Sequence, residues 1–198
     1  DSFHDGLALV LINEKFGFIN TEGDTVIPAI YEYALSFSDG LALIYQKQQD
    51  GNFKYGYVNT EGKLAINSQY DAAESFKFGM AKVNAGNIQG VINKLGEEVV
   101  PLRHSQVIDQ VIENAVSFQV FKTPNNTKSF VYYQDRDTLI EYSSQVLFYD
   151  NLAVVGNGKK YGVIDNYGRS VVGFAYDWID DFRAGHTLAR KDNGSYFV

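Results

Sequence analysis

The sequence lacks cysteine entirely, and it contains a single methionine, a single tryptophan and three prolines among 198 residues. Without cysteine there are no disulfide bonds and no thiolate chemistry, and both oxidising and reducing compartments stay open. Basic residues are also few, because 17 Lys and Arg stand against 24 Asp and Glu and give a formal net charge of −7. Such a molecule repels phosphate backbones, so we expect no nucleic-acid partner.

Long apolar runs are missing as well. A membrane-spanning helix needs roughly 18 consecutive apolar residues, and no segment approaches that length, so we expect a soluble chain without membrane insertion. Neither a starting methionine nor a signal segment is present, and Asp1 falls inside a repeat. We therefore expect a processed protein or a piece excised from a longer one.

Aromatic residues are abundant. The chain has 14 Tyr and 14 Phe, and 45% of its residues are hydrophobic, which is ample for a core. Aromatic and β-branched residues favour strands over helices. The composition therefore predicts an all-β protein.

Four landmarks recur along the chain: an F-x-D-G-L-A opening, an aromatic-Gly-x-[IV]-[ND] segment, a turn glycine and a Tyr-acid pair. Phe3 and Phe37 begin successive openings 34 positions apart, and Phe148 and Phe182 repeat that spacing. These spacings predict a single repeat domain over residues 1–198, with units at 3–36, 37–75, 76–109, 110–147, 148–181 and a partial 182–198.

Within a unit, short apolar segments are joined by hairpin signals such as Asn13-Glu14-Lys15. The segment Asn20-Thr21-Glu22-Gly23 predicts a tight turn, in which the Asn side chain bonds local amides and Gly supplies a positive φ. A glycine inside a strand weakens it. Its return at the same place in four units predicts close packing by another backbone or an aromatic ring there, at Gly17, Gly56, Gly90 and Gly162.

The repeat is interrupted in two places. Five additional residues lie between Ile44 and Tyr55, within Tyr45–Lys54, and such an insertion predicts a surface loop. The fourth unit is eroded, with strands expected near Ala115–Phe121 and Phe130–Tyr133, a long polar loop at Lys122–Lys128, and Asp135-Arg136-Asp137 as a turn without its glycine. The regular repeat reads as scaffold, so we expect function where it breaks.

Together these landmarks resemble the WG (KWG) β-repeat family of bacterial proteins. The family's tryptophan is replaced by Phe16, Tyr55, Gln89 and Tyr161, so any contact specific to indole is in doubt. The resemblance implies an array of β-hairpin units of bacterial origin, with no common enzymatic activity and no catalytic residues. It also implies interaction or envelope-associated modules, which favours an exported or cell-envelope location.

The predicted fold is an all-β array of β-hairpin or meander repeats of about 34 residues, three strands to a unit, forming an open twisted solenoid or spiral. A propeller-like ring is the alternative. A period of 34 is shorter than the roughly 40 to 50 residues of a four-stranded propeller blade, which favours the open form.

Residues with reactive side chains do not form a recognisable site. His4, His104 and His186 have no second His or Cys at metal-ligand spacing. Acid pairs at Glu97-Glu98 and Asp180-Asp181, and Asp135 with Asp137, read as solvated turn and loop acids, and Gly156-Asn157-Gly158-Lys159 reads as a hairpin turn. We assign no catalytic, cofactor-binding or metal-binding residue.

We expect a non-enzymatic module that binds a protein or glycan partner. Five tyrosines are candidates for a surface that holds sugar rings or peptide: Tyr55, Tyr57, Tyr132, Tyr133 and Tyr149. One alternative is a polysaccharide hydrolase that uses loop carboxylates such as Asp180 and Asp181. Another is a purely structural spacer, for which no partner is expected.

Overall fold

The structure is a computed structural model that describes residues 2–112, 115–121, 127–133, 138–182 and 185–198. These residues form antiparallel strands, turns and bends, with no helix among them, which confirms the all-β prediction. The sequence predicts one repeat domain, whereas the chain divides into two compact units, Asp1–His104 and Ser105–Val198. We call them unit 1 and unit 2.

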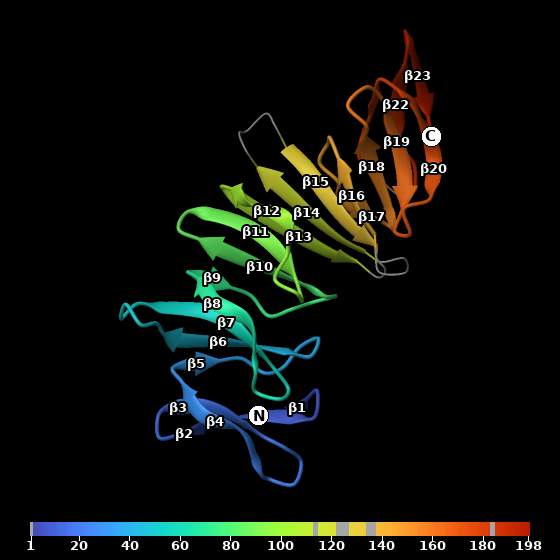
Figure 1. Cartoon of the computed structure of the whole chain (residues 1–198). Coiled ribbons are helices and arrows are strands. Elements are labelled where there is room, and N and C mark those ends of the chain that lie inside the picture. Colours follow the sequence, from blue (N-terminus) through green and yellow to red (C-terminus); the bar gives the residue numbers. More distant parts are fainter. Residues whose placement is uncertain (1, 113–114, 122–126, 134–137, 183–184) are drawn as a thin grey trace. The chain divides into compact units, whose positions relative to one another are not determined.

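Unit 1 contains three four-stranded sheets that follow one another along the chain (Figure 1). The first holds β1 (Phe3–His4), β2 (Leu7–Ile12), β3 (Lys15–Ile19) and β4 (Thr25–Tyr31). The second holds β5 (Tyr33–Ala34), β6 (Leu41–Lys47), β7 (Phe53–Asn59) and β8 (Leu64–Tyr70). The third holds β9 (Ala72–Ala73), β10 (Met80–Ala85), β11 (Ile88–Asn93) and β12 (Glu98–His104).

Unit 2 has two four-stranded sheets and one three-stranded sheet in its described residues. The first holds β13 (Gln106–Ile112), β14 (Ala115–Phe121), β15 (Thr127–Tyr133) and β16 (Thr138–Tyr142). The second holds β17 (Phe148–Tyr149), β18 (Leu152–Gly156), β19 (Tyr161–Asp165) and β20 (Ser170–Tyr176). The third holds β21 (Trp178–Ile179), β22 (Leu188–Lys191) and β23 (Gly194–Phe197).

The eroded fourth repeat is a complete sheet. Strand β14 has the predicted bounds, and β15 begins at Thr127 rather than Phe130. The predicted turn at Asp135–Asp137 and residues 122–126 of the predicted loop lie outside the described residues.

The predicted three strands per repeat are wrong, because most repeats add a fourth strand of only two residues. In the second sheet this strand is β5, which pairs Tyr33 with Tyr45 of β6. The chain after each Tyr-acid pair therefore begins the next sheet, and the strands of the second sheet span residues 33–70. The Phe opening inside it forms a tight turn with a bridge between Ser38 and Leu41.

The strand glycines are required by close backbone packing, as predicted. A Cβ on Gly17 would lie 2.7 Å from the amide nitrogen of Ala29 and from the carbonyl oxygen of Ile27. Strand β4 bulges at this point, since Phe16 pairs with Tyr31 but Phe18 pairs with Ile27. The same approach of the fourth strand occurs in the three other repeats, at Gly56, Gly90 and Gly162.

The Asn-x-x-Gly turns are also confirmed. The Asn20 side-chain oxygen accepts hydrogen bonds from the amides of Glu22 and Asp24, and Gly23 has φ +89°. The same two bonds return at residues Asn59, Asn93 and Asp165.

The core of each unit lies between consecutive sheets. The opening phenylalanine of one sheet packs edge-to-face on the third strand of the sheet before it, as Phe37 does on Phe18 and Phe76 on Tyr57, with ring centroids 4.8 and 4.7 Å apart. The openings at Phe148 and Phe182 are also buried, whereas Phe3 in the first sheet is 48% exposed.

Aspartates in the openings link consecutive sheets of unit 1. The carboxylate Oδ2 of Asp5 accepts a hydrogen bond from the Gly40 amide at 2.8 Å, and that of Asp39 accepts one from Gly79 at 2.7 Å. Each of these aspartates has a positive φ, which suits the tight turn before the second strand. The third opening has Phe78 in this position, with φ +53°. We call the Asp-to-Gly bonds inter-repeat ties.

A second link begins at a lysine at or next to the start of the third strand, which pairs with the acid after the fourth strand. These pairs are Lys54–Asp71 in unit 1, with Lys15–Glu32 before it, and Lys160–Asp177 in unit 2. Asp71 also accepts a hydrogen bond from the Gly86 amide of the next sheet, and Asp177 accepts one from Asp192. The third repeat has Ile88 and Ser105 in the two positions, and unit 1 ends there.

Candidate functional site

A row of tyrosines crosses the second sheet of unit 1. The register partners across β5, β6, β7 and β8 are, in order, Tyr33, Tyr45, Tyr55 and Tyr70. Directly paired residues in a sheet project on the same face, so these four rings form a line across the strands. Tyr70 is buried at the end of the line. We call the three others, Tyr33, Tyr45 and Tyr55, the tyrosine row.

The rings of the row are in contact and partly open to solvent. The centroids of Tyr45 and Tyr55 are 4.5 Å apart, and Phe53 stacks on Tyr45 at 5.4 Å. Phe16 of the first sheet meets Tyr33 edge-on at 5.8 Å, and Tyr33 is 40% exposed. Two groups of touching rings, Phe16 with Tyr33 and Phe53 with Tyr45 and Tyr55, are therefore brought to one face of the strands by the Tyr33–Tyr45 register pair, and we call them the strip.

The hydroxyl groups of the row influence one another. Partial burial raises the pKa of the Tyr55 hydroxyl, and the neighbouring Tyr45 and Tyr33 hydroxyls raise it further because a second phenolate beside the first is unfavourable. The raised pKa keeps the Tyr55 hydroxyl uncharged at neutral pH. A tyrosine hydroxyl both donates and accepts hydrogen bonds, so the row offers three such groups.

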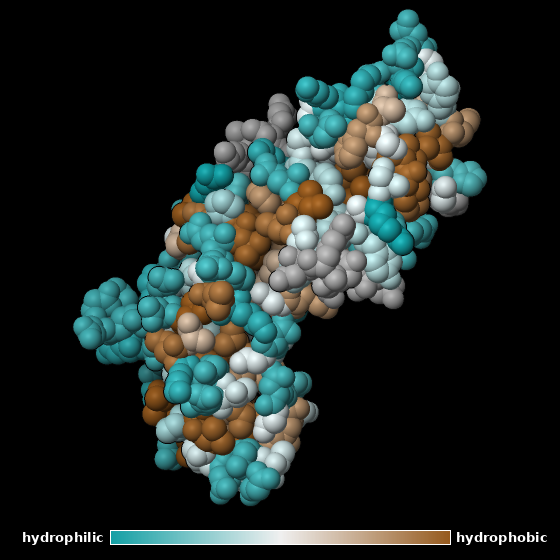
Figure 2. All heavy atoms as spheres, turned by 45° about the vertical axis from the view of Figure 1, so that its right-hand side comes forward, coloured by the Kyte–Doolittle hydropathy of each residue, from teal (hydrophilic) through white to brown (hydrophobic). Residues whose placement is uncertain are grey.

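The five-residue insertion extends the hairpin beside this row. The predicted surface loop is ordered chain, because Gln46 pairs with Lys54 and Lys47 with Phe53 before the turn at residues 48–52. The turn is held by the Asp50 carboxylate, which accepts a hydrogen bond from the Asn52 amide at 3.0 Å. Figure 2 shows a hydrophilic knob projecting at the level at which the β6–β7 hairpin ends in Figure 1.

The five tyrosines proposed from the sequence differ in their exposure to solvent. Tyr57 and Tyr133 are fully buried, so neither can present its ring to a partner. The Tyr57 hydroxyl donates to the Glu74 carbonyl at 2.7 Å, and burial raises its pKa. The correction has a physical reason, because the alternating pattern of a strand shows which residues share a face but not how much of that face the next sheet covers. Tyr55 and Tyr132 are half-buried and Tyr149 is 44% exposed.

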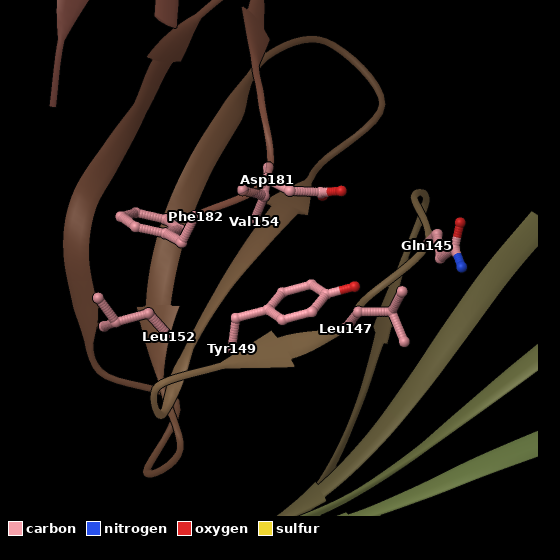
Figure 3. Close-up of a pocket in the computed structure, with 7 residues that line it drawn as sticks. All are labelled: Gln145, Leu147, Tyr149, Leu152, Val154, Asp181 and Phe182. Carbon is pink, nitrogen blue, oxygen red and sulfur yellow. The ribbon is translucent and has the colours of Figure 1, made fainter. Parts of the chain in front are cut away.

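Tyr149 lines a small pocket in unit 2 together with Asp181, which the sequence singled out on separate grounds. The pocket holds about 90 Å³ between β17, β18 and the chain after β21 (Figure 3). In the close-up the Tyr149 ring lies between Leu152 and Leu147, and Asp181 stands on the wall above it. Small-molecule sites usually measure about 300–1,000 Å³, so this pocket is too small for a sugar ring.

The acids and histidines are dispersed. The Asp180 carboxylate accepts a hydrogen bond from the Asp181 amide, and Asp181 is the one carboxylate that lines the Tyr149 pocket. In the described part of the chain, no group of three or more His, Asp or Glu side chains is placed to hold a metal ion. His104 is buried, and His4 and His186 are exposed.

Sequence reasoning missed Tyr33 and Tyr45, although it named Tyr55. The signal was the Asp50-Gly51 pair, because a hairpin centred there places Tyr45 opposite Tyr55. Tyr33 had no such signal, since its strand has only two residues.

Sequence comparison now decides the family. The profile described as WG containing repeat matches residues 16–48, 55–87 and 161–194, which together make up half of the chain. The chain belongs to the WG repeat family. All three matches begin at or next to the aromatic of the aromatic-Gly dipeptide, so the WG repeats of this chain keep the glycine and replace the tryptophan. No curated protein matches the sequence.

Solved structures with a similar arrangement include the WD40 domain of Toxoplasma gondii coronin, with 11% identity and a TM-score of 0.36 over 98% of this chain and 66% of that one. BamB from Moraxella catarrhalis has 8% identity and a TM-score of 0.35 over 98% and 82%. Hsv2 of Kluyveromyces lactis has 8% identity and a TM-score of 0.38 over 93% and 67%. The chain spans about two thirds of the first and third of these.

The WG repeats and the β-repeat fold point to an interaction module as the broad class of function. In the described residues no helix has the length and apolarity that crossing a membrane would require.

Proposed function

We propose that this WG repeat chain is a non-enzymatic module that binds a protein partner through the tyrosine row of unit 1. The observation that carries the proposal is the alignment of Tyr33, Tyr45 and Tyr55 as direct register partners on three neighbouring strands. Partly exposed tyrosines in contact give a large, rigid and amphipathic area, and tyrosine is enriched among the residues that dominate protein interfaces.

The WG scaffold does not need aromatic rings at these positions. In the third sheet the corresponding row across β9, β10, β11 and β12 consists of Ala72, Asn84, Gln89 and His104. That sheet forms with the same strand order as the second. A requirement of packing alone would apply equally to both sheets, so the tyrosines of the second repeat are better explained by contact with a partner.

Charged residues neighbour the strip in the chain or in the register. Lys47 is exposed opposite Phe53, Lys54 precedes Tyr55 and pairs with Asp71, and Lys15 precedes Phe16 and pairs with Glu32. An apolar centre with a polar rim is the usual anatomy of a protein interface. The rim mixes both signs of charge, so we expect a partner surface of mixed charge rather than a strongly acidic or basic one.

The tyrosine row also explains the position of the insertion. Repeat two alone carries the five additional residues, and they extend the hairpin that contributes Tyr45 and Tyr55. The longer hairpin adds Phe53 to the strip and projects a polar turn past it. The proposal therefore places the binding surface at one of the two interruptions of the repeat.

An affinity capture with matched variants tests the proposal. The wild-type chain, a Tyr45→Ser/Tyr55→Ser variant and a Tyr149→Ser control are used as baits on lysate and envelope fractions of the source cell. We expect a protein that wild type and Tyr149→Ser retain and that the double variant loses. With that protein purified, calorimetry is expected to show affinity reduced at least about tenfold, or ~1.4 kcal/mol.

Retention of the same proteins by the double variant would contradict the proposal, and so would the absence of any captured protein, as a structural spacer predicts. The double variant leaves the buried Tyr57 and Tyr70 in place, but it removes the Tyr55 ring, which is partly buried and packs against the same core cluster. Circular dichroism melting of each bait therefore checks that every variant is folded.

A further inference from the structure

Each unit contains a groove between the last strands of two consecutive sheets. In unit 2 it lies between β16 and β20 and has a volume of about 470 Å³. In unit 1 it lies between β8 and β12 and has a volume of about 220 Å³. We call them the β16–β20 groove and the β8–β12 groove.

The two grooves occupy equivalent positions in different repeats. Each of the seven residues that line the β8–β12 groove has a counterpart 72 positions later that lines the β16–β20 groove, as Tyr70 has Tyr142. The pairs are Gln69 and Glu141, Tyr70 and Tyr142, Ala85 and Asn157, Ile92 and Ile164, Gly96 and Gly168, Glu98 and Ser170, and Leu102 and Phe174.

The conserved parts of the groove belong to the scaffold. The Gly96 turn lies against Ile66 of the preceding sheet, where an added Cβ would be 3.5 Å from the Ile66 side chain. The isoleucine beside it is buried in both units, as Ile92 and Ile164. The floor of the groove therefore follows from stacking one sheet on the next, and its walls are free to vary.

The walls differ in a way that opens the groove and makes it more polar in unit 2. Ser170 replaces the longer Glu98. Asn157 and Ser143 add an amide and a hydroxyl to the wall, and Phe174 replaces Leu102 with its ring 39% exposed. The volume of the β16–β20 groove, about 470 Å³, therefore lies within the usual range of small-molecule sites, about 300–1,000 Å³.

The polar groups of the β16–β20 groove suit a neutral ligand. The Glu141 carboxylate is paired with the Lys128 ammonium, so its charge is balanced while its oxygens still accept hydrogen bonds. Asn157 uses its oxygen to accept from the amides of Lys159 and Lys160, which leaves its NH₂ group to donate. Ser170 offers a hydroxyl, and Phe174 and Ile140 supply apolar surface.

A sugar ring presents groups that match this lining of hydrogen-bonding and apolar side chains. Its hydroxyls both donate and accept hydrogen bonds, and its C–H face is apolar and packs on an aromatic ring. We infer that the β16–β20 groove of unit 2 is a binding site for a neutral saccharide, held by Phe174 on one side and by Glu141, Asn157 and Ser170 on the other. A second pocket, of about 220 Å³, shares Ser143 and Gly156 with the groove and is also lined by Tyr161.

The inference is independent of the tyrosine row, which lies in unit 1, so either can fail alone. The matched test uses two substitutions in the β16–β20 groove. Ser170→Glu introduces the residue that the narrower β8–β12 groove has at this position, and Phe174→Leu introduces the leucine found there. Ser170 is an exposed residue at the start of β20, so the longer side chain enters the groove without disturbing the core. Glu98→Ser is the control, because it changes the equivalent residue of the β8–β12 groove and leaves the β16–β20 groove unaltered.

The probes are neutral tetrasaccharides of β-1,4-glucose, β-1,4-N-acetylglucosamine and α-1,4-glucose, with polygalacturonate fragments and an uncharged extended tetrapeptide as comparisons. Methyl NMR of the full chain follows Ile140 and Ile164, with up to about 20 mM of each probe, a range that detects dissociation constants near 1 mM. We expect at least one neutral saccharide to shift both methyl signals. Ser170→Glu and Phe174→Leu are each expected to weaken that binding about tenfold, and Glu98→Ser to leave it unchanged.

The inference is overturned if no neutral saccharide shifts these signals, or if the shifts persist in both groove variants. It is also overturned if the tetrapeptide or the charged fragments bind and the neutral sugars do not. Should Ser170→Glu unfold, Phe174→Leu carries the test, because its smaller side chain is already present in the homologous position as Leu102.

Discussion

The carboxylate of Asp39 accepts a hydrogen bond from the backbone amide of Gly79, 40 positions further along the chain, at 2.7 Å. Asp5 makes the same bond to Gly40 in the preceding pair of sheets. One short acidic side chain thus joins each sheet of unit 1 to the next, and its own backbone forms the tight turn that presents it. The bond is partly buried and charge-assisted, which makes it one of the stronger links between repeats.

Removing this bond is expected to destabilise unit 1. Asp39→Gly keeps the positive φ at no steric cost, so the variant isolates the loss of the carboxylate. We expect the free energy of unfolding, measured by urea denaturation, to fall by about 1–2 kcal/mol. Glu14→Gly is the control, because Glu14 also has a positive φ, of 63°, in an exposed hairpin turn. An equal loss in both variants would show that the carboxylate contributes nothing.

Phe78 occupies the position of this aspartate in the third opening, with φ +53° and a ring that is 40% exposed. A bulky residue in the left-handed region is strained, and Asn adopts that region more readily. Phe78→Asn is therefore expected to raise the free energy of unfolding by about 0.5–1 kcal/mol in the same assay. A loss of stability would mean that the Phe78 ring makes contacts that outweigh the backbone strain.

Gly56→Ala is expected to be among the most damaging single substitutions in the chain. Its Cβ would stand 2.5 Å from the Ser68 hydroxyl and 2.7 Å from the Ser68 amide nitrogen, and the backbone cannot move without opening the bulge of β8. We expect a loss of about 3 kcal/mol or more in the free energy of unfolding. Gly173→Ala is the matched control, because nothing lies within 4 Å of its added Cβ. Tolerance of Ala at both positions would contradict the packing explanation.

The pKa of Asp71 is lowered from its ordinary value of 3.8, first by the ion pair with Lys54 and then by the Gly86 amide. Because the folded pKa lies below the unfolded one, the stabilisation is complete above the ordinary pKa and is lost as the pH falls through the folded pKa. In Lys54→Gln we expect the Asp71 pKa, followed by carboxyl NMR, to rise toward 3.8. Asp177, whose pKa is lowered by Lys160, is the internal control and is expected to stay unchanged. An unmoved Asp71 signal would assign the shift to Gly86 alone.

Features that arise within one repeat could be predicted from the sequence. The Asn20 to Gly23 turn and the crowding at Gly17 follow from local chemistry, and recurrence made both visible. The two-residue strands, such as Tyr33–Ala34, could not be predicted, because two residues show no periodicity. For that reason the number of strands per repeat was wrong.

Features that depend on strand register or on the stacking of sheets could not be predicted from the sequence. Tyr57 and Tyr55 share one face of β7, yet only Tyr57 is covered completely by the next sheet. The tyrosine row and the β16–β20 groove emerge only when strands are paired and sheets are stacked, since their residues are separated in the chain by whole strands.

The inter-repeat ties also set a rule for lengthening such a chain. Repeat two contributes one partner to each of two ties, because its Gly40 amide donates to the Asp5 carboxylate and its Asp39 carboxylate accepts from the Gly79 amide. A second copy of residues 33–71 inserted after residue 71 would offer its Gly40 where Asp39 now finds Gly79, so the junction is compatible with itself. Each copy would add another tyrosine row at a fixed pitch, and chains made in this way would present their partner with a graded series of valencies.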